Sequence, residues 1–200
     1  MFRLILDTAL EYSYLALLKD NQILNEAYDK GSNNHSETLM PKLELVLKEN
    51  DITLRDINEV YVGIGPGSYT GVRIAVVIAK MIAAMNNIKL YKFSSLLSIA
   101  SSVNGKSYPM VDCRRGNAYT ASFDYKDGSL VRLEEDKIVK ILDYTSKIDN
   151  SYILTSGKPN PLTLINSPDT KLVEDVNALS PNYLQLVEAE RIKKGLLWKL

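Results

Sequence analysis

A glycine-rich segment carries the strongest chemical signal in this chain. It reads Gly-Ile-Gly-Pro-Gly-Ser-Tyr-Thr-Gly-Val-Arg from Gly63 to Arg73 and stands between a strand-like run and a helical one. Backbone N–H groups at such a helix start can bind an anion, and glycines allow close backbone approach. The candidate anion- or nucleotide-binding residues are Gly65, Gly67, Ser68, Thr70, Gly71 and Arg73. The P-loop ending and the Gly-x-Gly-x-x-Gly spacing are both missing, so a tight turn packed against a neighbouring element is the alternative.

Asp7 and Thr8 place a carboxylate and a hydroxyl at the end of the first predicted strand. A phosphate loop at this point would need a glycine to approach the phosphate closely, and the chain has no glycine before Gly31. We therefore interpret Asp7 and Thr8 as hydrogen-bonding residues that stabilise a turn.

His35 is the single histidine of the chain. One imidazole cannot build a two-histidine metal site, and the single cysteine cannot supply a cysteine cluster. Nothing resembles the Gly-x-Ser-x-Gly elbow of serine hydrolases. We interpret His35 as a helix-entry residue, and we expect no catalytic residue, no metal and no cofactor.

A second polar motif joins two predicted strands in the second half of the chain. It consists of Asp112, Arg114, Arg115 and Gly116. The acid and the two arginines could pair with one another within a turn, or the arginines could face a ligand. Both interpretations remain open from the residues alone.

Alternating strands and helices must position these groups. In the first half, apolar patterning predicts strands over 2–7, 12–19, 22–28, 59–64 and 89–92 and helices over 36–50, 71–86 and 95–102. An Asp20-Asn21 hairpin followed by crossovers predicts a mixed sheet with helices on its face.

The character of the chain changes near residue 104. Beyond it, strands are predicted over 107–112, 117–125, 129–133 and 152–155, and helices over 143–148 and 181–194. We expect two lobes, residues 1–104 and a smaller lobe of residues 105–200.

The helix that follows the glycine-rich segment is apolar on nearly every side. Between Val72 and Met85 only Arg73 and Lys80 are charged, so a second surface besides the sheet must cover it. That cover could be the chain's own second lobe or first helix, or it could be another subunit. Three alanines at four-residue spacing form a stripe of small side chains that would let another helix approach closely. The candidate partner-binding residues are Leu39, Leu43, Val72, Ala75, Val76, Ala79, Ile82 and Ala83.

Composition narrows the class of protein. The 24 basic residues balance the 24 acidic ones, so the chain has no surplus of cations with which to hold a nucleic acid alone. One cysteine excludes a disulfide framework and fits a reducing compartment. No leader-like run opens the sequence, and the longest apolar stretch is shorter than the ~20 residues that span a bilayer. We expect a cytoplasmic protein.

The motifs together resemble the TsaB (YeaZ) family, whose members take part in threonylcarbamoyladenosine synthesis on tRNA. The resemblance is carried by Leu6-Asp7-Thr8, by Asn34-His35-Ser36-Glu37 and by the segment from Gly63 to Arg73. Further matches are Ser94-Ser95-Leu96, the Asp112–Gly116 motif with Tyr119, and Pro181-x-Tyr183-Leu184.

The resemblance implies an α/β fold of the two-lobed actin-like ATPase type with a reduced second lobe. It also implies a non-catalytic subunit that binds a TsaD-like enzyme through helices of the first lobe, together with a TsaE-like ATPase. Such a protein would reach tRNA only through the complex and could pair with itself when the partner is absent. TsaD-type enzymes use a His-x-x-x-His pair and further glycine-rich loops, and this chain has one histidine and no Gly-Gly pair. Three alternatives are an actin-like ATPase or phosphotransferase, a glycopeptidase-like hydrolase, and a regulator that binds nucleotide without turnover.

Overall fold

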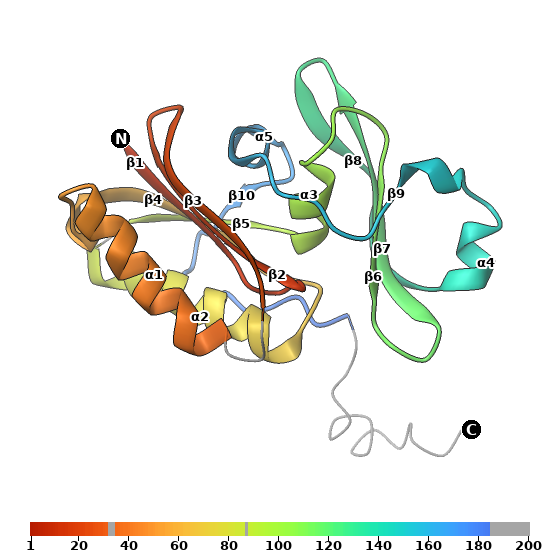
Figure 1. Ribbon diagram of the computed structural model, residues 1–200, viewed down its shortest axis with the longest axis horizontal. Helices are drawn as coiled ribbons and strands as arrows, with labels where there is room; N and C mark the ends of the chain where they lie inside the picture. Colours follow the sequence, from red (N-terminus) through yellow and green to blue (C-terminus); the bar gives the residue numbers. More distant parts are fainter. Residues whose placement is uncertain (32–34, 87, 185–200) are drawn as a thin grey trace.

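Two β-sheets with helices between and beside them make up the molecule (Figure 1). The computed structural model describes residues 1–31, 35–86 and 88–184. The first sheet has the strand order β10-β5-β4-β1-β2-β3, and the second has the order β8-β7-β6-β9.

The first sheet is mixed, as predicted. Its strands are β1 (Phe2–Asp7), β2 (Tyr12–Lys19), β3 (Gln22–Lys30), β4 (Ile57–Gly63), β5 (Lys89–Phe93) and β10 (Lys171–Leu172). The strands β1, β2 and β3 form an antiparallel meander, while β1, β4 and β5 run parallel. Asp20 has φ 54° in the β2–β3 turn, which confirms the predicted hairpin position.

Helices cover both faces of this sheet. One face carries α1 (His35–Glu49) and α2 (Tyr69–Asn86), and the other carries α3 (Ser95–Ala100). Alternation along β1 divides the core, because Leu4 and Leu6 pack with α1 and α2 while Ile5 packs with α3 and the second sheet. The core therefore has two layers, one on each side of the first sheet.

The second sheet is longer than its sequence pattern indicated. It contains β6 (Tyr108–Asp112), β7 (Asn117–Lys126), β8 (Ser129–Lys140) and β9 (Ile153–Leu154). In the chain, α4 (Ile141–Thr145) follows β8, and α5 (Pro161–Asn166) follows β9. Three-residue 3-10 turns stand at Leu54–Asp56 and Asn150–Tyr152. The prediction that β8 stops at residue 133 is wrong, because pairing with β7 carries this charged run on to Lys140.

The C-terminal part also departs from expectation. Residues 181–184 form no helix, and the rest of the helix predicted over 181–194 lies outside the described residues. We call residues 173–184 the strap, because they run from β10 along α2 to the β4–α2 loop. Asn182 donates its backbone N–H to Ile64 O at 2.7 Å. Proline can open a helix, but here Pro181 lies in an irregular segment that contacts the β4–α2 loop.

The two halves of the chain share a sheet, because a strand from beyond residue 104 joins the first sheet. The chain enters the second sheet after α3, and β10 then returns to pair with β5. The lobe boundaries remain a prediction. Among the described residues, no helix is long and apolar enough to cross a membrane.

Candidate functional site

The β4–α2 loop is pressed against the β1–β2 turn. A Cβ atom on Gly67 would lie 2.1 Å from Ala9 O, and one on Gly71 would lie 2.0 Å from Thr8 O. Real Cβ atoms never come so close, so only glycine permits this approach. Thr8 adds a buried hydrogen bond from its Oγ1 to Gly71 O at 2.6 Å. The glycines of the predicted anion loop are thus explained by backbone packing.

Three backbone donors of this loop are already used inside the protein. Gly65 donates its backbone N–H to Ser95 Oγ at 3.1 Å, and Ser68 donates its own to Ala9 O at 2.7 Å. Gly71 donates to Ser68 Oγ at 3.2 Å. These contacts favour the packed turn over the anion site, and binding of an anion at this loop, with Thr70 and Arg73, stays a prediction.

Asp7 lies at the centre of this junction and is completely buried. Its Oδ1 accepts hydrogen bonds from Ala9 N at 2.9 Å and Ser95 Oγ at 3.0 Å. Its Oδ2 and the Oγ of nearby Ser98 are buried and have no hydrogen-bond partner among the described residues. Burial raises the pKa of Asp7 to about 6, although the hydrogen bonds from Ala9 and Ser95 act in the opposite direction. The turn-stabilising role predicted for Asp7 therefore extends to α3, which Ser95 begins.

Arg73 is exposed at the start of α2 and contacts two tyrosines. Its guanidinium lies 4.0 Å from the Tyr69 ring centroid, and its Nε donates to Tyr183 Oη at 2.7 Å. A second hydrogen bond joins the guanidinium to Tyr69 Oη. Arg73 consequently attaches the strap to α2 and does not point into the loop as an anion ligand would.

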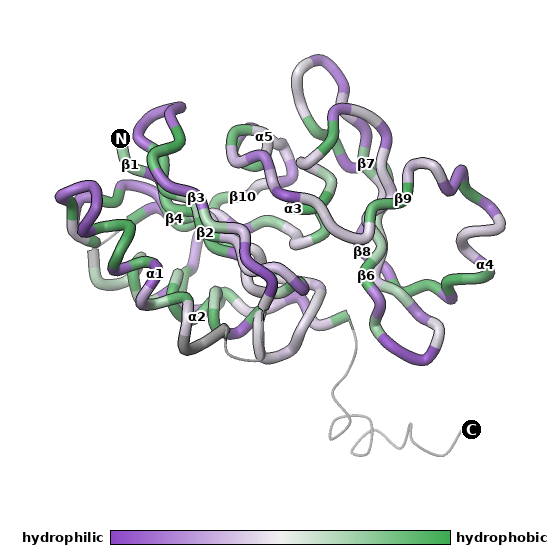
Figure 2. Tube along the Cα trace, in the orientation of Figure 1, coloured by the Kyte–Doolittle hydropathy of each residue, from purple (hydrophilic) through white to green (hydrophobic). Residues whose placement is uncertain are grey.

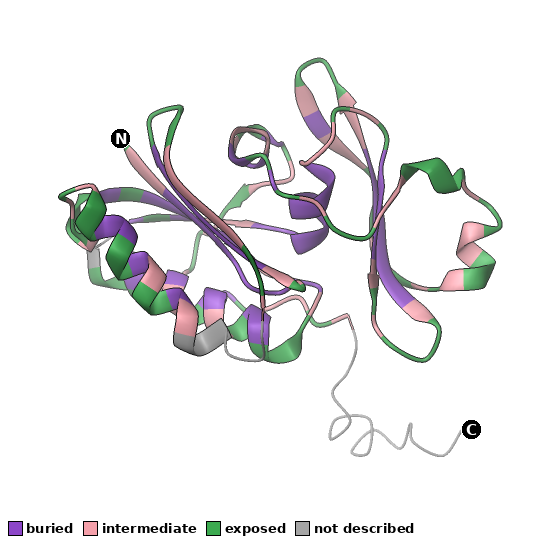
Figure 3. Ribbon diagram, viewed as in Figure 1, coloured by how far each residue is buried: buried purple, intermediate pink, exposed green. Residues whose placement is uncertain are grey.

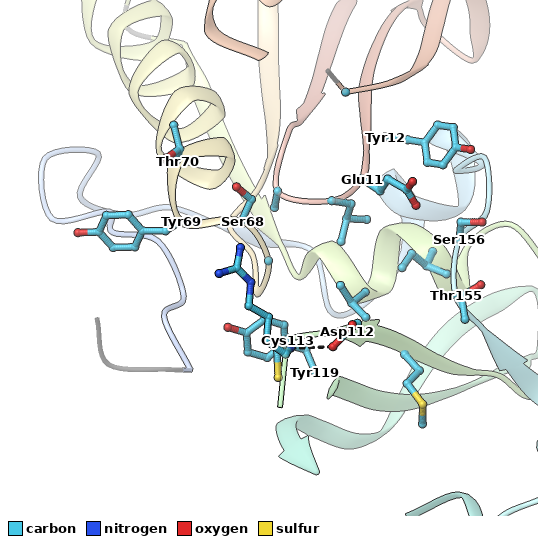
Figure 4. A pocket seen from close by; sticks show the side chains of 18 of the residues that line it. Glu11, Tyr12, Ser68, Tyr69, Thr70, Asp112, Cys113, Tyr119, Thr155 and Ser156 are labelled. Carbon is cyan, nitrogen blue, oxygen red and sulfur yellow. Dashed lines mark hydrogen bonds between the residues drawn. The ribbon is translucent and has the colours of Figure 1, made fainter. Parts of the chain in front are cut away.

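A cleft of about 800 Å³ opens between the two sheets (Figure 4). Glu11 and Tyr12 from the first sheet, Ser68 from the β4–α2 loop and Asp112 from the second sheet line it, together with segment 155–156. Its walls carry both carboxylates and one arginine, Arg114, so the cleft has no strong bias toward an anionic ligand. In the described part of the chain, no three His, Cys, Asp or Glu residues are grouped to hold a metal ion.

The turn between β6 and β7 is built on three successive residues with left-handed backbone. Arg114, Arg115 and Gly116 have φ values of 74°, 57° and 72°. Asp112 Oδ1 accepts the Arg114 backbone N–H at 2.7 Å, and the Asn117 side-chain amide donates to the carbonyls of both arginines. Within the described residues, Asp112 forms no ion pair with either arginine. The ion-pair alternative is therefore wrong, because this carboxylate accepts the Arg114 backbone N–H, while Arg114 lines the cleft and Arg115 is exposed.

The residues predicted to bind a partner lie inside the molecule. All of them are at most 4% exposed and belong to the core between the first sheet and its helices: Leu39, Leu43, Val72, Ala75, Val76, Ala79, Ile82 and Ala83. The alanine stripe faces the sheet and α1, where small side chains allow close packing. The assignment of these side chains to an intermolecular contact is corrected: they form the protein's own core.

The second surface that α2 required is supplied in part by the strap. Lys80 Nζ donates to the backbone carbonyls of Asn177 and Leu179 at 2.8 and 2.9 Å, and Leu179 joins the core beside α2. Sequence reasoning missed this contact, although a single lysine in the middle of an apolar helix was the available signal.

Both helices of this pair also carry exposed apolar side chains among the described residues. Figure 2 shows hydrophobic residues along α2, and Figure 3 shows that α1 and α2 both present exposed positions. The exposed large apolar side chains are Met40, Leu45, Val77, Met81 and Met85, with exposed fractions from 45% to 75%. We call these five residues the outer helix face. It is an apolar surface of the kind that marks a protein contact.

Comparison with known proteins gives a consistent result. Residues 25–179 match a family model described as "TsaD: tRNA N6-adenosine threonylcarbamoyltransferase". A relative from Bacillus subtilis, "tRNA threonylcarbamoyladenosine biosynthesis protein TsaB", is 31% identical over 94% of this chain and 95% of its own length. A protein of the same name from Escherichia coli is 30% identical over 68% of this chain and 61% of its own.

Solved structures show the same fold. The structure titled "YeaZ from Pseudomonas aeruginosa" superposes with a TM-score of 0.66 at 24% identity, covering 70% of this chain and 67% of that one. A second structure, titled as an uncharacterized protein with similarity to peptidase YEAZ from Pseudomonas aeruginosa, gives 0.78 at 20% identity, covering 92% and 99%. These likenesses show the α/β fold, and together with the family match they support the actin-like ATPase type expected from the sequence.

Proposed function

Because this chain belongs to the TsaB family of tRNA threonylcarbamoyladenosine biosynthesis proteins, we propose that it is a non-catalytic subunit that binds a TsaD-like transferase. In this role it stabilises the transferase that places a threonylcarbamoyl group on adenosine beside the anticodon. The observation that carries the proposal is the outer helix face, an exposed apolar surface on a helix pair whose inner side is fully packed.

The outer helix face has the properties of a contact surface. Val77, Met81 and Met85 follow one another at four-residue spacing on α2, so they lie on one side of the helix. Three of the five residues are methionine or valine side chains that are more than half exposed, and methionine adapts readily to a partner's shape. Burial of such a surface stabilises a complex by roughly 25 cal/mol per Å² of apolar area before the costs of association.

The junction around Asp7 supports the non-catalytic part of the proposal. The loop that would approach a phosphate is filled by its own backbone contacts at Gly67 and Gly71. The first hairpin has no glycine, and the chain's single histidine cannot form a His-x-x-x-His pair. The same proposal has four further parts. The protein acts in the cytoplasm, and its two lobes are residues 1–104 and 105–200. A TsaE-like ATPase joins the assembly, and the free chain pairs with itself.

The test is assembly with a TsaD-type subunit from the same organism, with the mass measured by light scattering. We expect a stable one-to-one complex, and we expect Val77→Glu/Met81→Glu to weaken it at least about a hundredfold because two charges would be buried at the contact. The matched control is Leu133→Glu/Leu142→Glu, which places two charges on exposed apolar positions of the second sheet and α4.

Three outcomes would contradict the proposal. Absence of a complex with or without nucleotide would refute the subunit role, and equal binding by both double variants would refute the outer helix face. Turnover of ATP by the isolated chain would favour the phosphotransferase alternative instead.

A further inference from the structure

The β6–β7 turn carries two exposed arginines, Arg114 and Arg115, and Arg114 also lines the cleft between the sheets. Within residues 1–31, 35–86 and 88–184, neither guanidinium forms an ion pair. The hydrogen bonds of the turn all involve the backbone, Asp112 and Asn117. The side chains are therefore available for a ligand outside the chain.

A third cation lies at the same end of the second sheet. Asn117 is paired in register with Lys140, and Ile141 N donates to Gly116 O at 2.9 Å, which holds the end of β8 beside the turn. Lys140 is exposed and, in the described region, has no carboxylate partner. We call Arg114, Arg115 and Lys140 the basic turn.

Local charge at this end of the second sheet is positive. Residues 112–117 and 137–143 contain four cations and two carboxylates, while the whole chain has 24 of each sign. One of the four, Lys137, is paired with Glu134. Of the two carboxylates, Asp112 is hydrogen-bonded to backbone. The charge that remains exposed is mainly positive.

The backbone of the turn keeps the arginines in fixed positions. A left-handed φ is costly for a residue with a Cβ atom, and here two such residues stand in succession, fixed by the Asp112 and Asn117 contacts. Both side chains therefore extend from an ordered turn, so less backbone freedom is lost when they bind a ligand.

We propose that the basic turn contacts the phosphodiester backbone of the tRNA substrate when this chain is assembled with its transferase. The proposal rests on the proposed subunit role. Arginine and lysine neutralise phosphates and release counterions. This contribution to the binding free energy needs no base-specific contact. A neutral chain with three such cations binds RNA too weakly alone, so the basic turn adds to a site that the partner supplies.

The experiment measures binding of an unmodified tRNA transcript to the assembled complex at several salt concentrations. We compare the wild-type chain with Arg114→Gln/Arg115→Gln and with Lys140→Gln, which remove charge while keeping side-chain length. The matched control is Lys89→Gln/Lys171→Gln, two exposed lysines on β5 and β10 of the first sheet. Light scattering on the same samples reports assembly, and thermal melts report folding.

The expected result is that the arginine double variant binds at least about tenfold more weakly at 0.1 M salt, and that the slope of log affinity against log salt falls by about 1.5. Lys140→Gln gives a smaller loss in the same direction, and the control binds as the wild-type chain does. Assembly is unchanged in every variant.

Several results would overturn the proposal. Unchanged tRNA affinity and slope in an intact complex would refute the basic turn while leaving the subunit role in place, and so would equal losses in the control. No complex with the wild-type chain would refute the subunit role and this proposal with it. Inorganic phosphate or AMP that binds through the arginines, while tRNA affinity stays unchanged, would show a small-anion site instead.

Discussion

Replacement of Asp7 by asparagine tests the account of the junction between β1, the β4–α2 loop and α3. The carboxyl is fully buried, and one of its oxygens has no hydrogen-bond partner in the described residues. Asparagine keeps the Oδ1 that accepts from Ala9 and Ser95, and its amide group can donate to the Oγ of Ser98. The substitution thus removes a buried charge while keeping the hydrogen bonds and the volume.

The size of the effect follows from the pKa of Asp7, which burial raises from 3.8 to about 6. The folded protein therefore binds more protons than the unfolded chain between about pH 4 and pH 6. Stability contributed by this residue is present at low pH and is lost as pH rises through that window. A difference of about two pKa units corresponds to roughly 3 kcal/mol.

We expect Asp7→Asn and the wild-type chain to be about equally stable near pH 4, and the variant to be more stable by up to roughly 3 kcal/mol at pH 7.5. The assay is denaturant unfolding of both proteins between pH 4 and pH 8. Asp20, Asp56, Asp149 and Glu134 have lowered pKa values and act in the opposite direction. Their contribution cancels in the difference between the two proteins.

Asp143→Asn, which removes an exposed carboxylate on α4 instead of a buried one, is the control substitution. The reasoning is refuted if the wild-type chain is the more stable protein at pH 7.5. It is also refuted if the difference for Asp7→Asn does not change between pH 4 and pH 7, since the buried charge would then carry no penalty.

Three further predictions follow from packing. Gly67→Ala should destabilise the chain by roughly 2–4 kcal/mol in denaturant unfolding, because its Cβ would meet a backbone carbonyl. The control is Gly105→Ala, whose Cβ would meet no atom and which should lower the free energy of unfolding by about 1 kcal/mol. Equal losses of stability in the two variants would contradict the predicted clash at Gly67. Ala79→Arg should unfold the protein and Val77→Arg should leave it folded by circular dichroism, since only Ala79 is fully buried; a folded Ala79→Arg chain would argue against the core assignment. Lys80→Met should increase proteolysis of the strap, and an unchanged cleavage pattern would show that the two carbonyl contacts do not hold it.

The sequence determined much of the local structure. The apolar runs of the first two strands and the helical spacing of apolar residues in α1 reflect burial of each element, and that signal lies in neighbouring residues. The glycine-rich segment was also evident, because a loop that joins a strand to a helix needs small residues at close approaches. Likewise, the family resemblance rested on strings such as Gly63–Arg73, which are local by nature.

Tertiary structure decided which side of α2 is buried and which side is exposed. Both sides are apolar, so the pattern around the helix gave no direction, and the small residues Ala75 and Ala79 were assigned to a partner. Only the packed fold shows that they meet the sheet and α1, while Val77 and Met81 remain exposed.

The remaining departures have the same physical cause. The strap, β10 and the extension of β8 depend on contacts between residues far apart in sequence: Lys80 meets Asn177, and Val173 donates to Leu90 O. A segment of charged or mixed residues has weak intrinsic preference, so its conformation is set by the surface that it meets. The role of Asp112 was decided in the same way, since a carboxylate beside two arginines fits an ion pair equally well until the backbone fold brings the Arg114 N–H to its Oδ1.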